Sequence, residues 1–285
     1  MSRPPTFTPP PCARARTLAT RRGRFAVLDA RPAGEPHGTV LMVPGYTGSK
    51  EDFIALLEPL AEAGYRTVAV DGRGQYETEG PDTREAYAQD ELAADVQAQA
   101  EALDTPLHLL GHSLGGQISR AAVLLDRTPF LSLTLMSSGP AEVAPGQRER
   151  IKLLSDALAT LTMAEVWEVM RSMESPVADL AAPAPGDGAE LRERWVRTHP
   201  AQLLVTGAQL TVEPDRVAEL AAVRRLPFHV ISGERDEVWP VPLLDDMAVR
   251  LGAHRTVVAG AEHSPNTGRP AETAAALADF WDTLY

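Results

Sequence analysis

The sequence contains a single cysteine, Cys12, among its 285 residues. One thiol cannot form an internal disulfide, and no cysteine or histidine cluster with metal-ligand spacing surrounds it, so neither a disulfide framework nor a metal site is predicted. No run approaches the ~18 consecutive apolar residues of a membrane span, and the N-terminus lacks the apolar core of a secretory signal. We therefore expect a cytoplasmic protein that uses no metal or other cofactor and does not enter a membrane.

Basic residues are fewer than acidic ones. The chain has 27 lysines and arginines against 39 aspartates and glutamates, a formal net charge of −12, which repels nucleic acid and anionic membrane surfaces. We expect neither as a partner and predict a small molecule instead. The arginines between residues 14 and 24 are interspersed with alanine, threonine and leucine, a pattern more typical of a solvated edge strand than of a basic recognition arm.

The most informative stretch is a Gly-x-Ser-x-Gly sequence centred on Ser113, which joins an apolar run to a helical pattern. A serine on a tight strand-to-helix turn needs almost no side chain two positions before and after it, and Gly111 and Gly115 meet that need. Such a turn exposes the hydroxyl of Ser113 and directs the first helical amides, beginning with that of Leu114, towards a nearby negative charge. The pattern predicts a nucleophile suited to acyl transfer.

Short apolar runs alternate with helical patterns along most of the chain. Strands are predicted at residues 25–28, 39–43, 67–70, 106–110, 131–136, 228–232 and 255–258. Helices are predicted at residues 52–63, 87–103, 114–125 and 271–284. This order predicts an α/β fold, a mostly parallel central sheet flanked by helices, whose functional groups gather at the carboxyl ends of the strands.

The region 141–223 contains helical stretches separated by breakers and no convincing strand, which predicts an inserted helical cap. Thr162 and Glu165 have the spacing of a capping box, so we expect a helix to begin after Thr162 and to carry Trp167 and Met170. The predicted organisation is a flexible leader at residues 1–12, a core at 13–140 and 224–285, and the cap at 141–223 with a Pro-rich connector at 175–188.

A serine hydroxyl is a weak nucleophile until a base removes its proton, and the base needs a third group that holds its tautomer. Asp236 and His263 each follow one of the last two predicted strands, which gives the chain order serine, aspartate, histidine. Asp245 and Asp246 are alternative acids, but a helix is expected there and would turn them to solvent. Asp236 is therefore the predicted acid.

The other histidines are predicted to be structural. His112 adjoins the serine, but neighbouring residues on a sharp turn point apart, which favours a structural role over a chemical one. His108 and His229 lie within predicted strands and His254 just before one, so core or surface positions are expected for all three.

With these residues the chain resembles the α/β-hydrolase superfamily over nearly its whole length. The resemblance rests on five motifs in order: Val43-Pro44-Gly45-Tyr46-Thr47-Gly48, Asp71-Gly72-Arg73-Gly74, Gly111-His112-Ser113-Leu114-Gly115-Gly116, Gly233-Glu234-Arg235-Asp236 with Pro240, and Glu262-His263. It implies that Ser113 is the nucleophile, that His263 acts as base and then as acid, and that Asp236 orients His263. It also implies an oxyanion hole formed by the backbone amides of Tyr46 and Leu114.

The activity that the resemblance implies is hydrolysis of a small carboxylic ester or a related acyl bond through an acyl-enzyme. A thioesterase, lactonase, perhydrolase or carbon–carbon bond hydrolase would use the same triad, and a non-catalytic ligand-binding protein on this fold is a further alternative. Trp167, Met170 and Trp239 are expected to line the substrate pocket, so an apolar acyl or alkyl group of modest size is the expected substrate feature. The sequence leaves the oligomeric state open.

Overall fold

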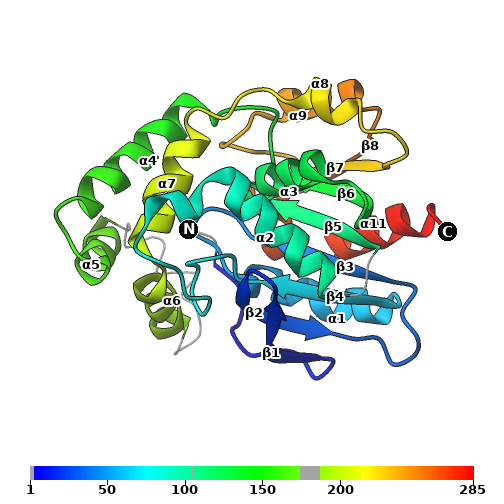
Figure 1. Ribbon diagram of the computed structural model, residues 1–285, viewed down its shortest axis with the longest axis horizontal. Helices are drawn as coiled ribbons and strands as arrows, with labels where there is room; N and C mark the ends of the chain where they lie inside the picture. The colour runs from blue at the N-terminus through cyan, green and yellow to red at the C-terminus, as the bar shows by residue number, and fades with distance from the viewer. Residues whose placement is uncertain (1–2, 104–105, 174–186) are drawn as a thin grey trace.

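A computed structural model describes residues 3–103, 106–173 and 187–285, and its centre is a sheet of eight strands (Figure 1). The strands are β1 Ala13–Thr20, β2 Gly23–Ala30, β3 Gly38–Val43, β4 Tyr65–Val70, β5 Leu107–His112, β6 Phe130–Met136, β7 Phe228–Gly233 and β8 His254–Val258. Their order across the sheet is β1-β2-β4-β3-β5-β6-β7-β8. From β4 to β8 neighbouring strands are parallel, whereas β2 pairs antiparallel with β4 and with β1.

The helices lie on both faces of this sheet. They are η1 Lys50–Phe53, α1 Ile54–Glu62, η2 Arg84–Tyr87, α2 Gln89–Glu101, α3 Leu114–Leu125, α4 Pro145–Leu158, α5 Met163–Met173, α6 Asp187–Arg197, α7 Pro200–Leu210, α8 Val217–Ala221, α9 Val241–Leu251, α10 Pro265–Gly268 and α11 Pro270–Asp282. Helices α1 and α11 supply one apolar cluster, and α2, α3, α8 and α9 supply the other. The predicted mostly parallel α/β sheet is confirmed.

Strand β3 shows how the sequence builds these two clusters. Successive side chains of a strand point to opposite faces of the sheet. Val40 and Met42 belong to the cluster of α1 and α11, whereas Leu41 and Val43 belong to the cluster of α2 and α3. An all-apolar run was therefore the correct signal of a central strand buried on both faces.

Strand β1 forms one edge of the sheet, as the pattern of residues 14–24 predicted. Its inner positions Ala13 and Leu18 are buried, and Arg14 and Arg16 are exposed. Arg16 donates from Nε to Asp29 on β2 over 2.9 Å. The arginines here are thus surface groups of an edge strand.

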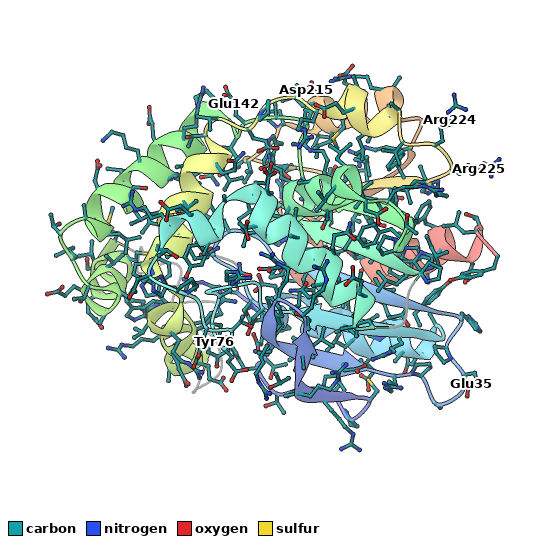
Figure 2. All side chains as sticks on the ribbon, in the orientation of Figure 1. Glu35, Tyr76, Glu142, Asp215, Arg224 and Arg225 are labelled. Atoms are coloured by element: carbon teal, nitrogen blue, oxygen red, sulfur yellow. The ribbon has the colours of Figure 1, made fainter. Side chains whose placement is uncertain are left out.

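The amino ends of the parallel strands carry exposed charged loops. Figure 2 shows Glu35, before β3, and Arg224 and Arg225, before β7, projecting outward on the right of the view. Helices α4 to α7, which follow β6 in the chain, lie on the opposite side of the molecule from these loops, at the left in Figure 1. The carboxyl ends of the strands, where a site was expected, face these helices.

Helices α5 and α6 form a separate apolar cluster. Trp167 of α5 packs with Trp195 of α6 and Leu203 of α7. The predicted capping box starts α5: the Glu165 amide donates to Thr162 Oγ1 over 3.3 Å, and the Thr162 amide donates to Glu165 Oε2 over 2.8 Å. Nearly all of the predicted Pro-rich connector, residues 175–188, lies outside the described residues. Helix α8 falls within the predicted cap range but packs with α9 and α3, and the domain boundaries stay a prediction.

Buried histidines make the fold sensitive to acid. Burial lowers the pKa of His108 to about 4 and that of His229 to about 3, from an ordinary 6.5. Below pH 6.5 these imidazoles bind protons in the unfolded chain but stay neutral in the folded one. Their contribution to the free energy of unfolding is therefore fully present above pH 6.5 and falls as the pH drops towards 4. Each histidine should contribute a slope of roughly 1.4 kcal/mol per pH unit in that window.

We expect His108→Phe to reduce the slope of the unfolding free energy against pH, between pH 6 and 5, by the contribution of one histidine, roughly 1.4 kcal/mol per pH unit. The phenyl ring keeps an aromatic partner for Trp281, whose ring lies 5.4 Å from that of His108, and removes the titrating group. Urea unfolding at several pH values measures the slope. An unchanged slope in a folded variant would show that His108 does not resist protonation.

Candidate active site

Ser113 lies at the turn between β5 and α3 in a strained backbone conformation. Its φ of 55° and ψ of −121° are unusual for a residue other than glycine, and such strain costs roughly 1–3 kcal/mol. The Ser113 amide donates to the carbonyl of Met136 on the neighbouring strand β6 over 2.9 Å. The surrounding sheet therefore holds the serine in a conformation that the local chain would not choose.

Two glycines permit this turn because the chain approaches itself closely on both sides of Ser113. A Cβ atom added at Gly111 would collide with the backbone of Gly115 and Gly116. One added at Gly115 would collide with the carbonyls of Val43 and Pro44. The spacing of glycines in the sequence thus reports a real steric requirement.

The side chain of His263 lies between those of Ser113 and Asp236, which the sequence separates by more than a hundred residues. His263 Nε2 is 3.1 Å from Ser113 Oγ, and Nδ1 is 2.9 Å from Asp236 Oδ2 and 3.0 Å from Oδ1. A carboxylate only accepts hydrogen bonds, so Nδ1 carries the proton and Nε2 is free to accept one from the serine hydroxyl. This is the tautomer that a general base needs.

Asp236 is fixed by the turn that follows β7. Its side chain is fully buried, and Oδ1 accepts the amides of Val238 and Trp239 over 2.8 and 3.0 Å. By contrast, Asp245 and Asp246 lie on α9 with side chains 55% and 62% exposed. They are exposed to solvent, as predicted, and pair with Arg255 and Arg250.

His112, for which a structural role was predicted, lies on the wall of the same site. Its Nε2 donates to the backbone carbonyl of His263 over 2.9 Å, and its ring is buried on the cavity wall. Burial, with the nearby His263 as a smaller cause, lowers the pKa of His112 to about 4. The imidazole is therefore neutral near pH 7 and braces the loop that carries His263.

The backbone amides of Tyr46 and Leu114 donate no hydrogen bond to any other described residue. Leu114 is the first residue of α3, directly after Ser113. Tyr46 follows Gly45, where an added Cβ would lie 3.2 Å from Ser113 Cβ, so this backbone passes close beside the serine. Both predicted oxyanion-hole amides are thus next to Ser113 and available.

The Tyr46 side chain anchors its loop. Its hydroxyl donates to the carbonyl of Leu203 on α7 over 2.9 Å, and burial raises the pKa of this phenol. The ring packs against Gly207, where even a methyl group would meet the tyrosine. Helix α7 thus positions the Gly45-Tyr46 turn.

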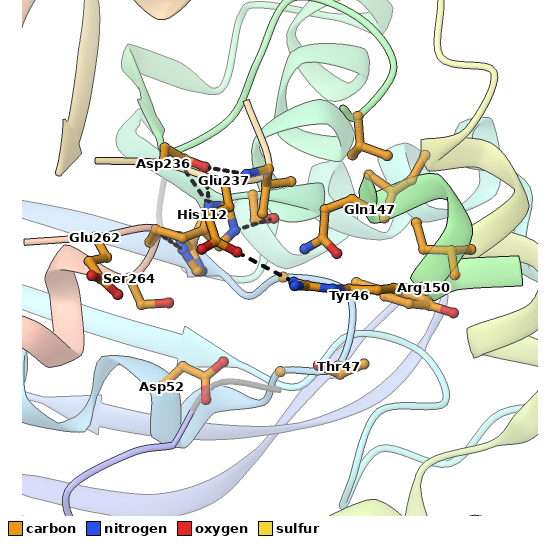
Figure 3. Close-up of a pocket in the computed structure, with 18 of the residues that line it drawn as sticks. Tyr46, Thr47, Asp52, His112, Gln147, Arg150, Asp236, Glu237, Glu262 and Ser264 are labelled. Atoms are coloured by element: carbon orange, nitrogen blue, oxygen red, sulfur yellow. Dashed lines mark hydrogen bonds and ion pairs between the residues drawn. The ribbon is translucent and has the colours of Figure 1, made fainter. Parts of the chain in front are cut away.

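A cavity of about 700 Å³ opens over the serine and is shown in Figure 3. Ser113, His263 and Asp236 lie on its wall. Its apolar lining consists of Val143, Ile151, Leu154, Leu210 and Val238. Gln147, Arg150, Ile151 and Leu154 of α4 lie at intervals of three, one and three residues, so one helical face borders the cavity.

Trp167, Met170 and Trp239 do not line the described part of this cavity, contrary to the expected pocket. Trp167 and Met170 belong to the cluster between α5 and α6, where Trp167 is 7% exposed. Trp239 is 1% exposed, and its indole donates to the carbonyls of Ala141 and Glu142 over 3.0 and 3.1 Å. These residues support the site's surroundings, while α4 and Leu210 supply the apolar wall.

Among the described residues, no three histidine, cysteine, aspartate or glutamate side chains form a group that could hold a metal ion. No described helix is both long and apolar enough to cross a membrane.

The chain matches known hydrolases in sequence and in structure. Residues 38–166 match the family model described as alpha/beta hydrolase fold. A 2-hydroxy-6-oxononadienedioate/2-hydroxy-6-oxononatrienedioate hydrolase of Paraburkholderia xenovorans is 28% identical over 237 residues, which cover 79% of this chain and 78% of that protein. A hydrolase from Pseudomonas aeruginosa aligns with a TM-score of 0.74 and 23% identity over 94% of this chain and 98% of that one. A thermophilic esterase from Thermogutta terrifontis aligns with a TM-score of 0.75 and 19% identity. The alignment covers 95% of this chain and 99% of the esterase.

The chain therefore has the alpha/beta hydrolase fold, which residues 38–166 match in sequence and which these hydrolases share in structure. The two structural likenesses are below 25% identity and show the shared fold alone.

Proposed function

We propose that this protein is a serine hydrolase that cleaves a small carboxylic ester or a related acyl bond through an acyl-enzyme formed on Ser113. The observation that carries the proposal is the imidazole of His263, which lies 3.1 Å from the Ser113 hydroxyl and 2.9 Å from the Asp236 carboxylate. The single cysteine fits a reducing compartment, and we place the enzyme in the cytoplasm.

Acylation begins when Ser113 Oγ attacks the substrate carbonyl carbon and its proton passes to His263 Nε2. The tetrahedral intermediate then breaks its bond to the leaving alcohol, whose oxygen takes the proton from Nε2. Asp236 stays ionised and stabilises the transient imidazolium through Nδ1. The product of this half-reaction is an ester of Ser113.

Deacylation repeats these steps with water. A water molecule attacks the acyl carbon and gives a proton to His263 Nε2, and the bond to Ser113 Oγ breaks as that oxygen recovers the proton. In both halves the negative charge on the carbonyl oxygen faces the amides of Tyr46 and Leu114. A donor of this kind contributes about 3 to 4 kcal/mol where it has been removed by mutation.

Carbon–carbon bond hydrolysis is the second candidate. It is favoured by the relative from Paraburkholderia, whose name describes cleavage of an oxodienedioate. The same serine, histidine and aspartate would serve that reaction, so the triad geometry fits both candidates.

Fluorophosphonate labelling with intact-mass analysis, followed by rates on p-nitrophenyl esters, acyl thioesters and a 2-hydroxy-6-oxodienoate, tests the proposal. One phosphonyl adduct with turnover of esters or thioesters is expected. An adduct with turnover confined to the dienoate would transfer the assignment to the second candidate. Neither adduct nor turnover in a folded protein would refute a serine mechanism.

The cavity wall also predicts which substitutions change acyl-chain preference. Leu154→Ala should shift the optimum towards longer chains, because the shorter side chain enlarges the cavity and each buried methylene of the substrate contributes roughly 0.8 kcal/mol. Trp167→Ala, in the cluster between α5 and α6, should destabilise the fold by about 3 kcal/mol and leave the chain-length profile unchanged. Values of kcat/KM across an acyl-length series, with urea unfolding, measure both. A shifted profile in Trp167→Ala alone would reverse the two assignments.

A further inference from the structure

The wall of the cavity holds two buried hydrogen-bond acceptors that have no partner among the described residues. They are Asp52 Oδ2 and His112 Nδ1. A buried polar atom without a partner carries a desolvation cost of about 1–3 kcal/mol, so such atoms need an explanation in each case. Both residues border the cavity that contains Ser113, and neither unpartnered atom has a part in the acyl-transfer steps.

Asp52 is held rigidly with one oxygen left over. Its side chain is 1% exposed, and Oδ1 accepts from Arg194 Nη1 over 2.8 Å. Its backbone carbonyl accepts from the Asn266 side chain over 2.7 Å. Figure 3 shows the carboxylate projecting from η1 on the side of the cavity where Thr47 lies, across the view from Asp236. Asp52 borders the cavity, and Oδ2 is its buried carboxylate oxygen without a partner among the described residues.

The unpartnered nitrogen of His112 is an acceptor too. Because Nε2 donates to the carbonyl of His263, the single proton of the neutral ring sits on Nε2 and Nδ1 has none. A Cβ added at Gly45 would lie 3.5 Å from this Nδ1, and one added at Gly48 would collide with Asp52 Oδ2. The two acceptors therefore flank the same Gly45–Gly48 turn, which carries the proposed oxyanion-hole amide of Tyr46.

The charges of the lining favour a donor over a carboxylate. Of the described lining residues, only two are arginines, and each pairs with a glutamate: Arg150 with Glu237 at 3.5 Å and Arg235 with Glu262 at 3.2 Å. Arg194 pairs with Asp52 Oδ1 at 2.8 Å and is 1% exposed. A substrate carboxylate would meet further acceptors here, whereas a hydroxyl or ammonium group would supply the missing donors.

We propose that Asp52, with His112, forms a subsite for a hydrogen-bond-donating group of the substrate, a hydroxyl or an ammonium on the acyl chain. This rests on the proposed acyl-enzyme function and names its substrate class: hydroxyacyl or aminoacyl compounds rather than dicarboxylates. A site built to bond such a group discriminates strongly against analogues that lack it, because its own polar atoms are then left unpaired.

The test compares p-nitrophenyl esters with acyl chains of three and of six carbons, each ending in a methyl, hydroxyl, ammonium or carboxylate group. We expect the hydroxyl or ammonium ester to exceed the methyl ester in kcat/KM by about tenfold or more at one of these lengths, and the carboxylate ester to be the poorest. A preference for ammonium over hydroxyl would identify a cationic ligand, and the reverse a neutral one. Equal rates for all four end groups at both lengths would overturn the subsite.

Asp52→Asn tests the residue itself, because the amide replaces one acceptor oxygen with a donor. The donor preference should fall by about tenfold and the carboxylate ester should gain relative to the methyl ester. Glu51→Gln is the matched control: Glu51 is a buried carboxylate one residue away, pairs with Lys50 at 2.8 Å and is not among the described lining residues. It should keep the preference. Retention of the full donor preference in folded Asp52→Asn would overturn the assignment.

Thermal melting shows whether each variant folds, and the wild-type comparison of end groups stands without any variant. The proposed function and the subsite fail in different ways. A protein that hydrolyses no ester would refute the proposed function. Hydrolysis without discrimination between end groups would refute only the subsite.

Discussion

Ser113→Ala is expected to abolish both fluorophosphonate labelling and turnover, with a loss of kcat on the order of 10⁴-fold or more. The substitution removes only a hydroxyl and keeps the strained φ of 55°, which alanine adopts at the same cost as serine. Its thermal unfolding should match that of the wild type. Intact-mass analysis and steady-state rates on the best ester measure the effect.

The double variant Ser113→Ala with His263→Ala should lose little more activity than the first substitution alone, because the side chains act as one unit. His263→Ala by itself should be nearly as inactive. Two losses that multiply in the double variant would contradict the mechanism, as would full hydrolysis by Ser113→Ala.

Asp236→Asn should lower kcat on the order of 10⁴-fold by changing the tautomer of His263. Asp236 Oδ1 accepts the amides of Val238 and Trp239, so the asparagine oxygen must stay there and its NH₂ group must face His263 Nδ1. That group donates, which moves the imidazole proton to Nε2. The ring then presents a proton to Ser113 in place of an acceptor.

Asp245→Asn is the matched control for this change. It also removes one carboxylate charge, nine residues after Asp236, but the Asp245 side chain is 55% exposed and pairs with Arg255 on the surface. Its kcat and KM should remain within about twofold of the wild type, since surface substitutions of this kind have small effects. A severe loss of activity in Asp245→Asn, together with an active Asp236→Asn, would show that Asp236 is not the acid of the triad.

The sequence was sufficient to predict the mostly parallel sheet and to place Asp236 and His263 at the same sheet edge as Ser113. All-apolar runs such as that of β3 have one explanation in a large α/β chain, burial on both faces. Residues placed directly after parallel strands, such as Asp236 and His263, must meet at one edge of the sheet. Chain topology alone brings these groups together, so no knowledge of side-chain packing was needed.

The sequence could not predict which residues line the cavity, for a physical reason. Helical periodicity shows that Trp167 and Met170 share a face, but it does not show which neighbour covers that face, and in the structure it is α6 rather than the site. The same kind of signal was present in α4, where Gln147, Ile151 and Leu154 lie on one face. Only tertiary contacts distinguish a helical face that lines a cavity from one that packs on another helix.

Strand β1 is one edge of the sheet, and no other strand of the described residues pairs with its outer side. Its exposed arginines bear on how the protein behaves in concentrated solution. An unpaired strand offers free backbone donors and acceptors to any other chain, which is a common route to aggregation. Arg14 and Arg16 are exposed on that strand, and Arg16 also pairs with Asp29, so charged side chains line the edge that a second copy would approach. Replacing them with valine or threonine would turn this edge into a template for intermolecular pairing, with the proposed catalytic groups untouched.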